Sequence, residues 1–152
     1  MNYSKRQFLF LVLLRISIGW HFLYEGFLKL LNPGWTSQGY LKSAEGPFGW
    51  FFQFLGSESL IGITDVLTIV MLLGAGITLI LGFKEKIGSF MGMVLLLMFY
   101  LAHPSLPGFE SGPAEGNYFL VNKNLIELLA LGVIAYFPTG KKFGLDNLIQ
   151  KK

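Results

Sequence analysis

The chain has 152 residues and a formal net charge of +3, and 53% of its residues are hydrophobic whereas only 14% are charged. A soluble domain usually has about 25% charged residues, so this composition predicts an integral membrane protein that forms a single domain over residues 1–152. The lack of cysteine excludes disulfides, thiol catalysis and iron–sulfur ligation by this chain. The sequence has no basic patch with interleaved aromatic residues, so a nucleic-acid partner is not expected.

The first predicted helix, residues 8–31, is a proline-free apolar run of 24 residues, long enough to cross a hydrocarbon core of about 30 Å. Its ionisable residues project within an arc of roughly 120° on one side of the helix; they are Arg15, His21, Glu25 and Lys29. This pattern predicts a helix that faces lipid over most of its surface and a polar bundle interior on one side.

An aromatic segment, Phe48–Leu55, follows within residues 32–59 and is too short to cross a bilayer. Aromatic side chains favour the membrane–water boundary. We therefore expect an interfacial helix, or a re-entrant cap over one end of the bundle, in the first outer loop. An ordinary amphipathic linker is the alternative.

Three further membrane helices are predicted, which makes the expected fold an all-α integral membrane four-helix bundle; their approximate ranges are 60–83, 87–102 and 118–137. The last of them is the least regular. Its apolar part begins at Asn124, and an extension back to Tyr118 includes Asn122 and Lys123. A short span of this kind is tolerated when its polar end packs inside the bundle.

The distribution of positive charge predicts the orientation. With four spans, both termini lie on one side together with eight Lys and Arg residues, namely Lys5, Arg6, Lys84, Lys86, Lys141, Lys142, Lys151 and Lys152. The other side has only Lys42 and Lys123. Because cytoplasmic loops are enriched in Lys and Arg, we expect a multi-pass protein of the cytoplasmic membrane with both termini in the cytoplasm.

Ionisable and amide residues from all four predicted helices then fall at a similar depth in the outer half of the bundle. Buried ions in a membrane are costly unless they are paired or hydrated, so a polar pocket is predicted. Its candidate proton-handling residues are Glu25, Asp65 and Glu127, and its candidate ligand-binding residues are Arg15, His21, Lys29, His103 and Asn124.

Each candidate also has a structural interpretation. Lys29 can extend to the outer interface as an anchor, His103 can cap a helix end before a proline, and Glu25 with Lys29 can form a purely structural pair four residues apart. No HxxxH or ExxH spacing is present, so no metal site is predicted.

Two segments resemble the DoxX family. Arg15–Pro33, RISIGWHFLYEGFLKLLNP, is similar to the first-helix signature of that family, and Asn122–Ala135, NKNLIELLALGVIA, is similar to its fourth helix. The four-span layout with an aromatic outer loop is similar as well. The matching positions are Arg15, Gly19, Glu25, Gly26, Lys29, Asn124 and Glu127.

The resemblance implies a function in quinone chemistry. A relative, DoxD, is the larger subunit of thiosulfate:quinone oxidoreductase, which implies a quinone cofactor and a second subunit or electron-donor protein. Two classes of function remain open. One is a quinone-linked oxidoreductase or its membrane subunit, and the other is a non-enzymatic scaffold or small transporter. Membrane lipid is the expected environment of the chain. Association with further copies of the chain is left open.

Overall fold

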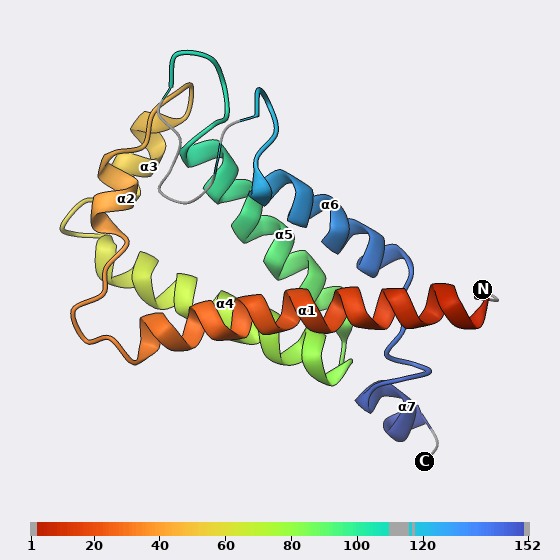
Figure 1. Cartoon of the computed structure of the whole chain (residues 1–152). Helices are drawn as coiled ribbons and strands as arrows, with labels where there is room; N and C mark the ends of the chain where they lie inside the picture. The colour runs from red at the N-terminus through yellow and green to blue at the C-terminus, as the bar shows by residue number, and fades with distance from the viewer. Residues whose placement is uncertain (1–2, 110–115, 117, 151–152) are drawn as a thin grey trace.

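The computed structural model describes residues 3–109, 116 and 118–150. Over these residues every regular element is a helix, which confirms the all-α prediction (Figure 1). The helices are α1 (Lys5–Leu30), α2 (Gln38–Lys42), α3 (Gly49–Leu55), α4 (Ile61–Leu81), α5 (Glu85–Ala102), α6 (Lys123–Tyr136) and α7 (Leu145–Gln150).

Three of these helices, α1, α4 and α5, are long and apolar enough to cross a membrane. They have 26, 21 and 18 residues, which corresponds to roughly 39, 32 and 27 Å of helix. The chain is therefore a membrane protein with several apolar helices. Helix α6 is shorter than these three, with 14 residues. Its place as a fourth membrane span stays a prediction.

The ends of α1 and α6 are set by polar caps. Ser4 and Gln7 form a reciprocal capping box, so α1 begins at Lys5, three residues earlier than predicted. Asn122 caps α6 by accepting a hydrogen bond from the backbone of Leu125. The helix therefore begins at Lys123, five residues later than predicted, and the segment before it has two residues with positive φ.

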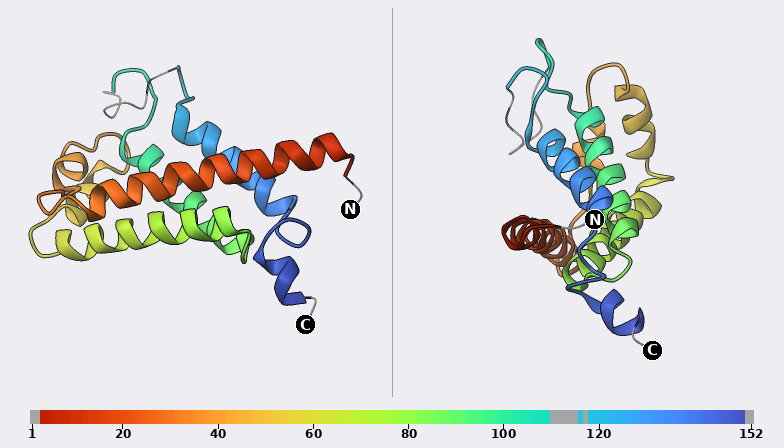
Figure 2. Two further views of the ribbon diagram at one scale, coloured as in Figure 1. Left: turned by 60° about the horizontal axis from the view of Figure 1, so that its bottom comes forward. Right: turned by 90° about the vertical axis from the view of Figure 1, so that its right-hand side faces the viewer.

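The long helices pack in pairs, with α1 beside α4, α4 beside α5, and α5 beside α6 (Figures 1 and 2). Their shared core consists of Ile18, Phe22, Leu72, Ala75, Leu79, Leu95, Leu96, Leu131 and Ile134. Small residues allow the close approach, since a Cβ atom at Gly76 would lie 2.6 Å from the backbone nitrogen of Leu23. Such approaches are typical of helix pairs in membranes.

A second, smaller core joins α2 and α3 to the end of α5. It consists of Leu41, Ala44, Phe52 and Ala102. In Figure 1, α2 and α3 lie at the end of the molecule opposite the N-terminus. The predicted aromatic segment is thus helical over Gly49–Leu55, and its position at a membrane interface stays a prediction.

Candidate functional site

A buried ion pair ties α1 to the start of α5 and to the segment after α6. Arg15 and Glu85 are only 1% and 2% exposed, and Nη1 of Arg15 lies 3.2 Å from Oε2 of Glu85. The same guanidinium donates to Oγ1 of Thr139 at 2.7 Å and to the carbonyl oxygen of Phe143 at 2.9 Å. Oε1 of Glu85 accepts from the backbone nitrogen of Gly140 at 2.7 Å. This cluster, which we call the arginine cluster, therefore fixes the C-terminal segment to the helices.

Sequence reasoning missed Glu85. It lies in Lys84-Glu85-Lys86, which reads locally as a solvated charged turn. The structure buries it because the C-terminal segment packs directly on this turn, where a Cβ atom at Gly140 or Gly144 would lie within 2.6 Å of the carbonyl oxygen of Gly82. A pair of glycines four residues apart after α6 is the available signal for this contact.

A cavity of about 330 Å³ lies between α1, α4, α5 and α6 and is covered by the segment that joins α1 to α2. Four of the predicted site residues border this first cavity, namely His21, Glu25, Lys29 and Asn124. Apolar side chains form most of the remaining wall, including Phe22, Leu72, Leu96 and Phe99. The first cavity thus presents ionisable and amide groups on one part of its wall and hydrocarbon on another.

Glu25 and Lys29 form an ion pair on consecutive turns of α1, as their spacing predicts. The Lys29 ammonium also lies 5.5 Å from the ring centroid of Trp35, in a cation–π arrangement. Both contacts orient the lysine along the wall of the first cavity.

Two further candidate residues lie directly behind the wall. Oε1 of Glu127 lies 2.8 Å from Nδ1 of His21, and this pair bridges α6 and α1. Asp65 accepts hydrogen bonds from the backbone nitrogen and the hydroxyl of Ser37, at 2.9 and 2.5 Å. Of the three predicted carboxylates, Glu25 therefore borders the cavity, while the other two reach it through a neighbour.

His103 is also one residue removed from the cavity. Its Nε2 donates to the carbonyl oxygen of Tyr40 at 3.0 Å, and the two rings lie 4.4 Å apart. Tyr40 itself borders the first cavity. Arg15 is the exception among the candidates, because it belongs to the arginine cluster.

Asn124 combines burial with an unused donor. The residue is 3% exposed, and its Nδ2 has no hydrogen-bond partner in the part of the chain that the structure describes. An unsatisfied buried donor costs about 1–3 kcal/mol. Asn124 borders the first cavity, but its Nδ2 has almost no accessible surface, so a bound molecule can supply the missing acceptor only after the amide turns toward the cavity. Over the described ranges, no three His, Cys, Asp or Glu side chains gather in a way that could hold a metal ion.

Comparison with known proteins identifies the family. The DoxX family model matches residues 10–104, which include most of α1 and all of α2–α5. The match ends before α6, so Asn124 and Glu127 lie outside it. No curated protein and no solved structure matches the chain. Since the family model covers more than half of the sequence, this membrane protein belongs to the DoxX family.

Proposed function

We propose that the first cavity binds the head group of a quinone and that the chain acts as a quinone-linked oxidoreductase, or as the membrane subunit of one. The observation that carries the proposal is the pairing of donors, on Lys29 and Asn124, with an apolar wall in one cavity inside a membrane protein. A quinone ring needs both, because its two carbonyl oxygens accept hydrogen bonds while its faces are apolar.

The size of the first cavity suits a single ring. Small-molecule pockets usually enclose about 300–1,000 Å³, and this one, at about 330 Å³, lies at the lower end of that range. Phe22 and Phe99 can flank the ring, and Nδ2 of Asn124, which has no partner among the described residues, can donate to one carbonyl oxygen once its amide turns toward the cavity. Binding would thereby remove the unfavourable free energy of an unsatisfied donor.

Reduction of a quinone to a quinol takes two electrons and two protons. Without cysteine, the chain lacks ligands for an iron–sulfur centre, so a partner subunit or a soluble reductant supplies the electrons. The protons reach the ring oxygens through groups at the wall: Glu25 directly, Glu127 through His21, and Asp65 through Ser37. Positioned carboxylates and imidazoles are common proton carriers in such reactions.

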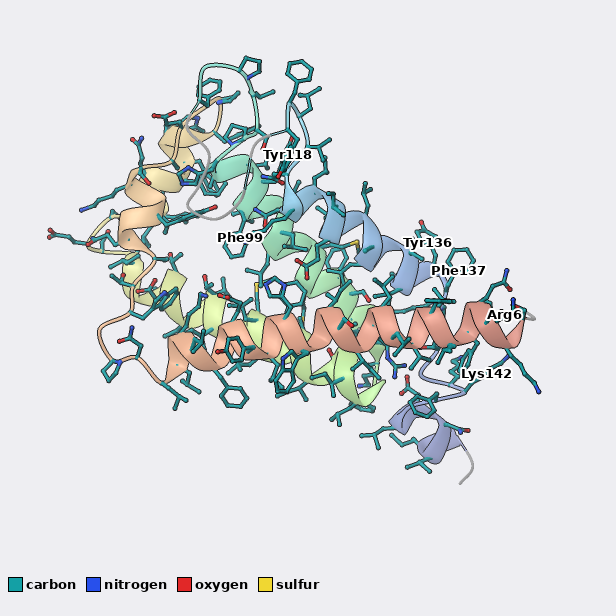
Figure 3. The ribbon with its side chains drawn as sticks, in the orientation of Figure 1. Arg6, Phe99, Tyr118, Tyr136, Phe137 and Lys142 are labelled. Carbon is teal, nitrogen blue, oxygen red and sulfur yellow. The ribbon has the colours of Figure 1, made fainter. Side chains whose placement is uncertain are left out.

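Orientation in the cytoplasmic membrane is part of the proposal. Arg6 and Lys142 lie at the same end of the molecule, near Tyr136 and Phe137, whereas Tyr118 lies at the other end (Figure 3). The positive-inside rule assigns the first end to the cytoplasm. With α6 as the fourth span of a four-helix bundle, the first cavity then lies in the outer half of the membrane.

Reporter fusions test this orientation. A reporter after Lys152 is expected in the cytoplasm, and one inserted between Leu106 and Pro107 is expected outside. The measurement is the activity of a reporter that works on only one side of the membrane, with both fusions made to full-length protein. Signals from the same side would contradict four spans.

Quinone binding is tested with the protein in lipid nanodiscs, titrated with a benzoquinone that has no tail. Lys29→Gln should weaken binding about tenfold, the effect of one lost hydrogen bond worth about 1.4 kcal/mol. The matched control is Lys42→Gln, since Lys42 is exposed and does not border the first cavity. Equal affinity in all three proteins, or no binding to wild type at saturating quinone, would favour a scaffold or transporter.

A further inference from the structure

A second cavity, of about 270 Å³, lies between the α2–α3 segment and helices α4 and α5. Its wall is formed almost entirely by hydrocarbon, including Phe52, Leu55, Met71, Val94, Leu95 and Met98. The hydroxyls of Thr64 and Thr68 also border it, but both donate to backbone carbonyl groups of their own helix region. A cavity whose polar groups are already paired favours an apolar occupant.

The two cavities share part of their walls. Tyr40, Thr68 and Phe99 border both of them. The Tyr40 and Phe99 rings meet edge to face with centroids 6.0 Å apart, and the Tyr40 hydroxyl donates to the carbonyl oxygen of Phe99 at 3.2 Å. Phe99 is labelled in Figure 3, on α5. The polar and apolar cavities are thus neighbours, with one layer of side chains between them.

The second cavity also reaches the outer surface of a membrane-spanning helix. Ile63 and Leu67 of α4 border it and are 69% and 55% exposed. Exposed apolar residues on a membrane-spanning helix contact lipid. A hydrocarbon chain can therefore pass from the cavity into the bilayer without crossing a polar surface.

We infer that the second cavity holds the proximal part of the isoprenoid tail of the quinone whose head group occupies the first cavity. This inference rests on the proposed function and adds the substrate class, a quinone with a hydrocarbon tail. The shared wall favours this occupant over the acyl chain of a bulk lipid. When the side chains of Tyr40 and Phe99 turn aside, a single amphiphile reaches both cavities and leaves its distal tail in the membrane.

The test compares two quinones with the same benzoquinone ring, one without a tail and one with a ten-carbon tail. Leu67→Trp narrows the second cavity at its rim, and Val70→Trp is the matched control because Val70 is also exposed on α4 but does not border the cavity. Leu67→Trp should weaken binding of the tailed quinone at least tenfold and leave the tailless one unchanged, whereas Val70→Trp should change neither. All variants are measured in the same lipid, so partitioning of the tailed quinone into the bilayer affects every apparent affinity equally and cancels when variants are compared.

Val94→Phe narrows the same cavity from another helix, α5, so the test still holds if Leu67→Trp disturbs the local fold. This variant should have the same selective effect. Unchanged affinity for the tailed quinone in both variants would overturn the tail site while leaving the head-group site intact. Competition by decanol as strong as that of the tailed quinone would also overturn it, because the cavity would then accept any acyl chain. If neither quinone binds wild type, the proposed function itself fails.

Discussion

The arginine cluster and the first cavity contain similar residue types but differ in how deeply the charged groups are buried and in whether a cavity adjoins them. In the arginine cluster, Arg15 and Glu85 pair with each other, and neighbouring hydroxyl and backbone groups complete most of their remaining hydrogen bonds. Around the first cavity, Asn124 keeps an unused donor and Glu25 is 40% exposed. Each region holds one buried donor without a partner among the described residues, Nε of Arg15 and Nδ2 of Asn124. The adjoining cavity and the partly exposed charges are therefore what suit the second region to binding.

Removal of the Glu85 carboxylate should have the largest effect on stability. Glu85→Ala leaves Arg15 buried without its counter-charge, and breaking such a pair usually costs about 3–5 kcal/mol. We expect a clear loss in the free energy of unfolding, measured by thermal or denaturant unfolding in detergent. Glu58→Ala is the matched control, because Glu58 is exposed, and it should change stability by less than about 0.5 kcal/mol. Similar losses in both variants would mean that the arginine cluster contributes no more to stability than an exposed carboxylate does.

Asn122 and Asn124, at the start of α6, separate stability from binding: both have a buried Nδ2 without a partner among the described residues, but Asn122 caps the helix and Asn124 borders the first cavity. Asn124→Leu removes the unpaired donor, so stability should stay equal or rise while quinone affinity falls about tenfold. Asn122→Ala removes the cap of α6 and should cost about 1 kcal/mol of stability, with little change in affinity because Asn122 does not border the first cavity. Unfolding and quinone titration of both variants are the measurements. A stability loss in Asn124→Leu larger than that in Asn122→Ala would assign Asn124 a structural role.

The smallest effect on stability is expected at Glu25. Glu25→Gln removes an ion pair between residues four apart on one helix, which is worth about 0.3–0.5 kcal/mol when exposed. Its effect on the rate of quinol formation with a soluble reductant should be much larger, because the carboxylate borders the first cavity. An unchanged rate would remove Glu25 from the proposed proton path. Glu58→Gln serves as the control, because Glu58 borders neither cavity.

Much of the fold and part of the site are accessible from the sequence. The apolar runs of α1, α4 and α5 contain few charged residues, so hydrophobic transfer and local hydrogen bonding decide these helices. The Glu25–Lys29 pair follows from helical spacing alone. The gathering of residues from separate helices at one cavity could be anticipated only from their approximate depth.

The start of α6 and the partner of Arg15 could not be predicted in this way. The predicted fourth helix includes Asn122, whereas the structure uses this residue as the cap. Arg15 was expected with the other site residues, but it pairs with Glu85, which is 70 positions away in sequence.

The sequence by itself determined where the chain is apolar enough to be helical in a membrane, because those free energies depend on residues within a few turns of one another. Only the tertiary structure decided that Glu85 is buried and that Asn124 borders a cavity while Asn122 caps a helix. These outcomes depend on how each helix is rotated and how closely it packs against its neighbours, and no local pattern in the sequence fixes either quantity.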